Sequence, residues 1–249
     1  MNVIIAYKWE RDSDEATISS DGSLKWFDTK LRASDDEAAA IASARQLAAD
    51  TGGTMTAVTI GDGDATWALA RGASRAVSIG GYFPAKDNAV TASALVNAIR
   101  AAGDTDLVVL GDAREFSGVV PAVAAQLGLP LVAGVADFAA DPENPGCVIA
   151  HRNTDQAQET LRIHTPAVIS VSATSKEKTA PTIRQIMAAK RLPIDKLDAA
   201  ELGGLSDSSL QVTGCRLPIR REARLFEAEG DADKAVNELV AALRARDVL

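Results

Sequence analysis

The sequence predicts an α/β fold in which helices cover a doubly wound, mostly parallel sheet. Residues 3–7 form an unbroken apolar run, which is typical of a central strand buried on both faces. Residues 54–60 form a β-rich run, and a short helical segment at 65–71 leads through Gly72 into a second β-rich run at 76–79. Two strands this close together around a short helix indicate a right-handed crossover in a parallel sheet.

The segment between the first two strands predicts a hairpin followed by a helix. Residues 16–18 and 24–27 flank an Asp-Gly turn, which favours a small hairpin. Ser34 and Glu37 then have the spacing of a capping box, in which each side chain satisfies a free amide of the first helical turn.

Further alternation of helices and strands completes the sheet. Asp87 can cap a helix that ends at Gly103, and a buried strand follows at 106–111. A helix at 118–127 and a strand at 131–135 come next. This pattern indicates a doubly wound, Rossmann-like sheet.

The segment at 141–146, rich in Pro and Gly, breaks this alternation. The strands that follow have polar turns and predict an antiparallel extension at the sheet edge, at residues 147–151, 159–163 and 167–171. We predict a domain over residues 1–195, and a C-terminal arm plus amphipathic helix over 196–249. Periodicity alone leaves open whether this helix packs on a partner chain or on its own domain.

Composition excludes several classes of protein. A chain of 249 residues that is 47% apolar can bury a large core, and its net charge of −8 argues against nucleic acid as a partner. No apolar run is long enough to span a bilayer, and the start of the chain lacks the pattern of a targeting segment. Cys147 and Cys215 lie far apart, so reduced thiols without a metal are expected. A cytoplasmic protein without membrane insertion is the expectation.

The loop after the strand at 106–111 is the most suggestive place for a ligand. It runs into a helix, so the amides of Ser117, Gly118 and Val119 would face a phosphate, with Arg114 and Lys8 adding positive charge. A surface loop with a glycine-capped helix explains the same residues. The sequence shows no evident set of catalytic residues, because neither His151 nor His164 has a Ser, Cys or carboxylate at a spacing that indicates catalysis. The sequence also lacks the glycine-rich motifs of NTPases and dinucleotide-binding proteins.

Several segments resemble the electron transfer flavoprotein (ETF) β subunit family. The first strand and Lys8 are similar to the family's "ILVAVK", residues 34–47 to "NPYDEIALEEALRL", and residues 106–111 to "DLVLLG". The likeness covers almost the whole chain. The remaining matches are residues 67–77 with "ALAMGADRA", 166–171 with "LPAVVTV" and 183–194 with "LPNIMKAKKKPI".

This resemblance implies a fold of the adenine nucleotide alpha hydrolase-like kind. It also implies an electron carrier rather than an enzyme with catalytic residues of its own. The family forms a heterodimer with an ETF α-like subunit, which holds most of a FAD, and the β subunit closes over the isoalloxazine end. Electrons pass from dehydrogenases to a quinone or ferredoxin-side acceptor. The family β subunit also buries an AMP, and the corresponding AMP-type site here comprises Ala6, Lys8, Ile60, Gly111, Arg114, Ser117, Gly118 and Val119.

Three departures from the family pattern concern ligands and partners. The AMP loop is shortened to residues 111–118, which leaves AMP retention open and argues against a second flavin. The family's docking loop for dehydrogenases falls at Thr174, Ser175, Lys176, Glu177 and Lys178, where Ser175 replaces an anchoring leucine. Trp9 or Trp26 could replace the family's aromatic residue near the flavin, since Asp35 stands in its place.

Two other functions compete with the electron carrier. A stand-alone adenine-nucleotide-binding protein of regulatory or stress type could use the same fold, but it would not need the C-terminal arm and helix. An ATP-pyrophosphatase-type enzyme would need a phosphate loop of the SGGxDS kind, which the sequence lacks.

Overall fold

The computed structural model describes residues 1–11, 16–21, 23–26, 31–61, 64–80, 87–112, 117–174, 180–198, 210, 213, 223–227 and 230–249. The chain divides into two compact units, which are considered separately. The first comprises Met1–Thr17 and Lys25–Thr213, and the second Ile18–Leu24 and Gly214–Leu249.

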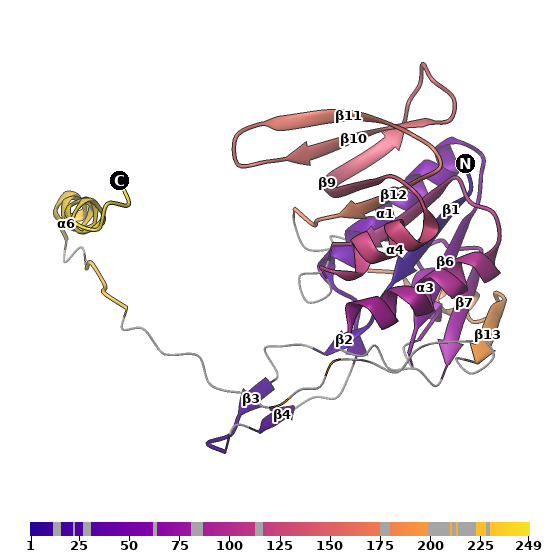
Figure 1. The fold of residues 1–249 in the computed structure, drawn as a ribbon, viewed down its shortest axis with the longest axis horizontal. Helices are drawn as coiled ribbons and strands as arrows, with labels where there is room; N and C mark the ends of the chain where they lie inside the picture. Colours follow the sequence, from indigo (N-terminus) through magenta and orange to yellow (C-terminus); the bar gives the residue numbers. More distant parts are fainter. Residues whose placement is uncertain are drawn as a thin grey trace. The chain divides into compact units, whose positions relative to one another are not determined.

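A nine-stranded sheet forms the framework of the first unit (Figure 1). Its strand order is β11-β10-β9-β12-β8-β1-β6-β7-β13. The ladders from β9 through β12, β8, β1, β6 and β7 to β13 are parallel, whereas β10 is antiparallel to β9 and to β11. The strands are β1 (Val3–Tyr7), β6 (Met55–Ile60), β7 (Arg75–Gly80), β8 (Leu107–Gly111), β9 (Leu131–Ala140), β10 (Cys147–Asn153), β11 (Gln158–His164), β12 (Ala167–Val171) and β13 (Ile194–Asp198).

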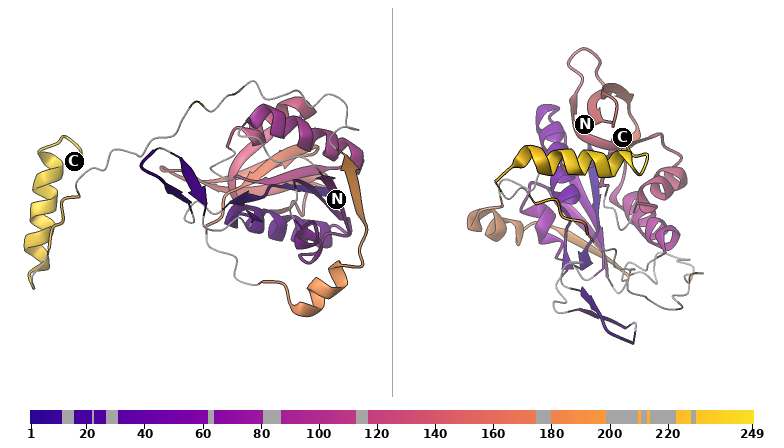
Figure 2. Two further views of the ribbon diagram at one scale, coloured as in Figure 1. Left: turned by 90° about the horizontal axis from the view of Figure 1, so that it is seen from below. Right: turned by 90° about the vertical axis from the view of Figure 1, so that its left-hand side faces the viewer.

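Helices cover both faces of this sheet and create two apolar cores. Helices α1 (Asp35–Asp50) and α2 (Thr66–Leu69) lie on one side, and α3 (Asn88–Ala102) and α4 (Val119–Leu127) on the other (Figure 2). Successive side chains of a strand point to opposite faces. Val3, Ile5 and Tyr7 accordingly join the core beneath α1, whereas Ile4 and Ala6 join the core beneath α3 and α4. The unbroken apolar run of β1 is therefore the consequence of two buried faces.

The helix starts largely agree with the sequence. The carboxylate of Asp87 accepts from the amide of Ala89 at 2.9 Å and so caps α3 as predicted. The Ser34 hydroxyl accepts from the amide of Glu37 at 3.2 Å, which is half of the predicted capping box. The other half is wrong, because the Glu37 carboxylate enters the interior and binds two neighbouring strands.

The predicted antiparallel extension is correct for β10 and β11 and wrong for β12. β12 lies between β9 and β8 and is parallel to both. All of its side chains are buried, as expected of a strand covered on two sides. The sequence also gave no signal for β13, whose charged residues fit an edge strand exposed on one side.

Smaller elements accompany the sheet. β2 (Glu10–Arg11) pairs with β5 (Leu31–Arg32), and β3 (Ala16–Ile18) pairs with β4 (Leu24–Trp26), which confirms the predicted hairpin. Helix α5 (Ile183–Ala189) begins with a complete capping box between Thr182 and Gln185.

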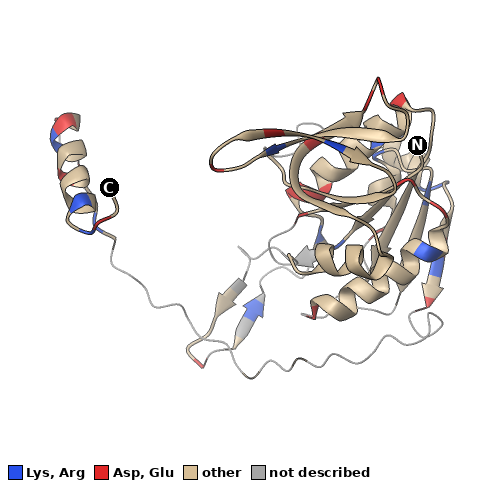
Figure 3. Ribbon diagram, turned by 45° about the horizontal axis from the view of Figure 1, so that its top comes forward, with Lys and Arg blue, Asp and Glu red and all other residues tan. Residues whose placement is uncertain are grey.

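The second unit contains helix α6 (Ala232–Arg244), which Asp231 caps by accepting from the amide of Lys234. No residue of α6 is buried. Figure 3 shows charges of both signs along α6, whereas α3 and α4 have Arg100 as their only charged residue. Across the residues that the structure describes, no helix has the length and apolar character needed to cross a bilayer.

Candidate functional site

The order of the strands reverses between β1 and β8. After β1 the chain adds β6 and β7 on one side, and then returns to place β8 on the other side. Ligands of open α/β sheets bind beyond the carboxyl ends of the strands at such a reversal. The parallel register pairs Ile5 with Val109, so Lys8 and Gly111, at the ends of β1 and β8, lie at the same edge of the sheet.

A buried ion pair occupies this edge. Oε1 of Glu37 accepts from Nζ of Lys8 at 2.9 Å and from the backbone amide of Lys8 at 3.2 Å. Oε2 of Glu37 accepts from the backbone amide of Gly111 at 2.9 Å. The Lys8 side chain is 2% exposed and that of Glu37 is 1% exposed. Charge-assisted hydrogen bonds that are shielded from water are strong. The opposite charges of Lys8 and Glu37 also offset the free-energy cost of removing each other from water.

Gly111 permits this close approach of α1 to β8. A Cβ atom at this position would lie 2.6 Å from the backbone nitrogen of Glu37 and 2.8 Å from Glu37 Cδ. Real Cβ atoms do not approach other atoms so closely, so a side chain here would push the first turn of α1 away. The glycine is therefore needed for space rather than for an unusual backbone angle.

The residues predicted for an AMP-type site gather around the same edge, and they divide into two groups. Ala6, Ile60 and Val119 are fully buried in the core beneath α3 and α4. Lys8 and Gly111 bind Glu37, as described above. Ser117 and Gly118 form the turn that starts α4, and Arg114 lies outside the described residues.

The start of α4 is the turn at which the sequence predicts a phosphate. Gly118 occupies the N-cap, and no side chain among the described residues caps the helix there. The first amides of such a helix need an acceptor from outside the helix, and its dipole favours a negative charge. A Cβ atom at Gly118 would lie 2.3 Å from Nδ2 of Asn88, so the first residue of α3 approaches the same turn.

The first turn of α1 also reaches the end of β12. Oδ1 of Asp36 accepts from the amide of Ala173 at 2.6 Å, and Oδ2 of Asp112 accepts from the Ser172 hydroxyl at 3.1 Å. Of the predicted docking residues, Thr174 directly follows this contact, whereas 175–178 lie outside the described residues.

Burial raises the pKa of Asp36. The amide of Ala173 opposes this shift, whereas the negative charges of Asp112, Glu37 and Asp35 add to it. A carboxyl group whose pKa is higher in the folded state favours folding when it is protonated. The contribution of Asp36 to stability is therefore present at low pH, and is lost as the pH rises through its raised pKa.

Three aromatic rings pack together beside β1. The ring centroids of Tyr7 and Trp67 are 5.0 Å apart, and Trp9 lies 5.7 Å from Tyr7 and 6.0 Å from Trp67. The guanidinium of Arg71 lies 4.2 Å from the centroid of Trp67. Among the described residues, Tyr7 Oη and Trp9 Nε1 have no hydrogen-bond partner. Burial raises the pKa of Tyr7, so its phenol stays neutral.

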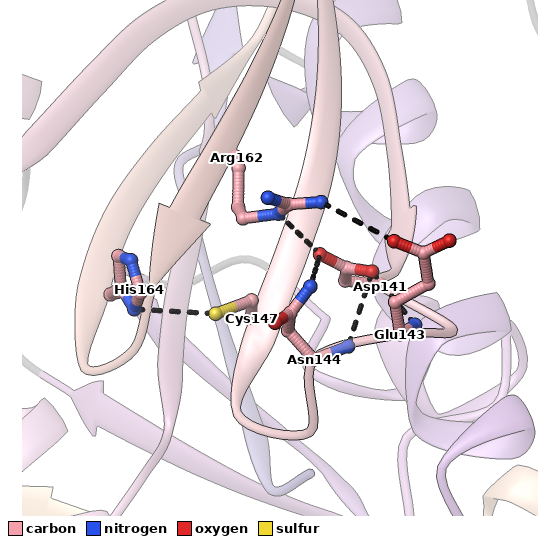
Figure 4. Close-up of polar contacts among 6 residues, drawn as sticks. All are labelled: Asp141, Glu143, Asn144, Cys147, Arg162 and His164. Atoms are coloured by element: carbon pink, nitrogen blue, oxygen red, sulfur yellow. Dashed lines mark hydrogen bonds and ion pairs between the residues drawn. The ribbon is translucent and has the colours of Figure 1, made fainter.

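The antiparallel extension holds a second polar cluster, drawn in Figure 4. The Asp141 carboxylate accepts from the amide of Glu143 at 2.9 Å and from Nε of Arg162 at 2.6 Å, which closes the turn between β9 and β10. Cys147 Sγ lies 3.3 Å from Nδ1 of His164 on the neighbouring strand. Spacing in the sequence did not reveal this pair, because the strand register brings the two residues together. Cys147 is only 4% exposed, which keeps its thiol from a substrate.

Removal of the Glu37 carboxylate should destabilise the sheet unit strongly. We expect Glu37→Ala to lower the free energy of unfolding by about 3–5 kcal/mol, because the buried charge of Lys8 would lose the carboxylate that binds it most closely in this structure. Urea unfolding followed by circular dichroism measures this change. Asp35→Ala is the matched control, since it removes an exposed carboxylate from the same turn and should change stability by less than about 0.5 kcal/mol. Equal small effects of the two substitutions would contradict the structural role of Glu37.

Known proteins resemble this chain over most of its length. Residues 28–202 match the model of the electron transfer flavoprotein domain. The chain is also 30% identical over 212 residues to the electron transfer flavoprotein subunit beta of Mycobacterium leprae (strain TN), an alignment that covers 79% of this chain and 77% of the relative. The family match favours the electron-carrier prediction over a stand-alone nucleotide-binding protein. The chain belongs to the electron transfer flavoprotein β subunit family.

Proposed function

We propose that this chain is one half of a heterodimer that passes electrons from dehydrogenases to a quinone or ferredoxin-side acceptor. Its partner is an ETF α-like subunit that holds most of a FAD. Membership of the ETF β family supports this proposal. The observation that carries it is the apolar face of α6, where the exposed fraction is 56% for Val236 and 42% for Leu239.

The apolar face of α6 fits a surface of the α subunit. Val236, Leu239, Val240 and Leu243 recur at helical spacing, which produces one apolar stripe on the helix. The described residues of this chain bury none of them. A helix of this length is marginal alone in water, so packing against another protein would stabilise it.

The residues of this chain would position the FAD and provide the environment in which it reacts. FAD, when bound, supplies the capacity to accept and donate electrons. The sequence has no glycine-rich dinucleotide motif, which fits a flavin held mainly by the partner. The buried pair of Lys8 and Glu37 would keep the carboxyl ends of β1 and β8 in place beside the flavin end of the heterodimer.

The first test is purification of the heterodimer after co-expression with an ETF α-like chain. We expect a one-to-one complex with the visible spectrum of bound FAD. Changing Val236 and Leu239 to Ser should weaken the complex by at least about a hundredfold, because each buried apolar side chain contributes about 1.5–3 kcal/mol.

The matched control changes the exposed polar residues Asn237 and Glu238 of the same helix to Ser. This control should form the FAD-containing complex, as the wild type does. If this chain stayed a colourless monomer and bound no ETF α-like chain, the heterodimer would be refuted. A complex that survives the loss of Val236 and Leu239 would refute the role of α6 alone.

We also propose that an adenine nucleotide of the AMP type binds at the start of α4. The first turn has no cap from a described side chain and offers backbone amides to a phosphate, and Ala6, Ile60 and Val119 provide apolar surroundings. Lys8 is engaged by Glu37, so the amides would be the main contact for the phosphate.

A charge at position 117 tests this nucleotide site. Ser117→Glu should weaken AMP binding by tenfold or more in isothermal titration, since a carboxylate at this turn competes with and repels the phosphate. Ser117→Gln has nearly the same size without the charge, and its affinity should stay close to that of the wild type. Equal affinities for the two variants would place the nucleotide elsewhere, and no binding by the wild type would refute the site.

The segment at 174–178 is proposed as the surface that dehydrogenases contact. Ser175 stands where the family has an anchoring leucine, and Lys176, Glu177 and Lys178 replace its usual neighbours. A dehydrogenase that requires an apolar anchor should bind this protein weakly, so a dedicated partner is expected.

Restoring the apolar anchor tests this prediction. In the heterodimer, Ser175→Leu should tighten binding to ETF-dependent dehydrogenases by about 1.5–3 kcal/mol, the contribution of a buried Leu side chain. Surface plasmon resonance with several ETF-dependent dehydrogenases measures the difference, and Ser175→Asn serves as a polar control. A leucine variant that no dehydrogenase prefers would exclude this anchor position.

A further inference from the structure

We propose that residues 183–192, here called the α5 surface, bind the anionic phosphate layer of a lipid bilayer without crossing it. The α5 surface comprises helix α5 and the turn that follows it. Membrane binding of this kind goes beyond the proposed function and does not depend on it, because only the side chains of this segment and their charges support it.

Large apolar side chains are exposed along the α5 surface. The exposed fraction is 81% for Ile183, 56% for Met187, 39% for Ile186 and 38% for Leu192. Ile183, Ile186 and Met187 have the spacing i, i+3 and i+4, so they form one stripe on the helix. Contiguous exposed apolar surface marks a contact with a partner or with a membrane.

Positive charges accompany this apolar stripe. The α5 surface contains Arg184, Lys190 and Arg191, and residues 179–194 include no Asp or Glu. All three cations are exposed, and none of them forms an ion pair with any residue that the structure describes. The whole chain has a net charge of −8, so these residues form a local positive patch on an acidic protein.

Helix α5 projects from the sheet unit, where Figure 2 shows it in orange. Ala189 is the only residue of α5 that is buried, and it joins the core to which α2 contributes Ala68 and Leu69. A complete capping box of Thr182 and Gln185 stabilises its first turn. The exposed side chains therefore lie on an ordered helix at the periphery of the unit.

An anionic bilayer offers both kinds of contact that this surface needs. Its outer layer carries negative phosphates, and apolar acyl chains lie directly beneath them. Arg and Lys side chains can keep their charged ends at the phosphates, while neighbouring Ile and Met side chains reach the apolar layer. Each cation near an anionic surface strengthens binding by about fivefold.

Other partners fit the α5 surface less well. In a pair of copies of this chain, the three cations of one α5 surface would repel those of the other. A protein partner would need an acidic groove around a helix that is exposed on most sides, whereas a fluid lipid interface adapts to a projecting helix. Repulsion between the bilayer and distant carboxylates of the chain is screened beyond about 10 Å at 0.1 M salt.

Vesicle co-sedimentation of the full chain, alone and in complex with an ETF α-like subunit, tests this proposal. The wild type should bind vesicles of phosphatidylcholine with about one-third phosphatidylglycerol, and should not bind pure phosphatidylcholine vesicles. Its binding should fall as the salt concentration rises. Arg184→Gln with Arg191→Gln should weaken binding about 25-fold, and Ile183→Ser with Met187→Ser by about tenfold or more.

Two matched controls, both measured on the full chain alone, separate the α5 surface from the rest of the protein. Arg45→Gln with Arg100→Gln removes two exposed arginines of α1 and α3, and so makes the same change in net charge. Val236→Ser with Leu239→Ser disrupts the apolar stripe of α6. Both controls should bind vesicles as the wild type does. All four variants change exposed side chains and should keep the circular dichroism spectrum of the wild type.

The outcomes decide between the bilayer and other partners. A wild type that does not bind anionic vesicles, or α5 variants that bind as the wild type does, would overturn the proposal. Loss of binding in the α6 control alone would assign the membrane contact to α6. Loss of vesicle binding in the complex would also overturn the proposal, because the α5 surface would then be a protein interface. If no complex forms, the heterodimer is refuted, whereas vesicle binding by the full chain still decides the role of the α5 surface.

Discussion

The buried carboxylate of Glu37 is the contact on which this end of the sheet depends. It accepts from Lys8 and Gly111, at the ends of the two strands between which the strand order reverses. Parallel strands separate beyond their last ladder bond, because no further amides and carbonyls are paired. The Glu37 carboxylate lies between the two strand ends and joins them by its hydrogen bonds. The cation of Lys8 compensates the negative charge of this carboxylate, which is shielded from water.

The first turn of α1 also positions the end of a third strand, β12. Ser34 caps α1 and so fixes the direction of its first residues. Glu37 then turns inward to β1 and β8, while Asp36, its neighbour in sequence, contacts the chain after β12. A single turn of helix thus sets the relative positions of three strand ends. The missing side chain of Gly111 is part of this arrangement, since it allows the turn to approach β8.

The sequence predicted the order of the central elements well, because buried parallel strands are unbroken apolar runs and helices begin at Ser34 and Asp87 with recognisable caps. It failed for β12, whose length and composition are compatible both with an edge strand and with a central strand. Only pairing with β8 and β9 distinguishes the two. The spacing of Ser34 and Glu37 also fits two structures, a capping box and an inward carboxylate, and the buried amine of Lys8 selects the second.

In the candidate site too, the sequence predicted features that depend on neighbouring residues, but not contacts between residues far apart in the chain. The turn before α4 could be recognised from its own residues, as could Lys8 at the end of the first strand. The contacts of Asp36 with Ala173 and of Cys147 with His164 could not, because they depend on strand order and register. Long-range pairing is a property of the assembled sheet, and local spacing contains no signal for it.

The two units differ in how their structure is stabilised. The sheet unit has apolar cores on both faces, which supply the burial that a domain needs to fold. Helix α6 has an N-cap and an apolar stripe, but none of its residues is buried. Capping contributes only about 1 kcal/mol, too little to offset the ordering of a helix with no packed face. The folding of α6 should therefore be coupled to the surface that covers its stripe.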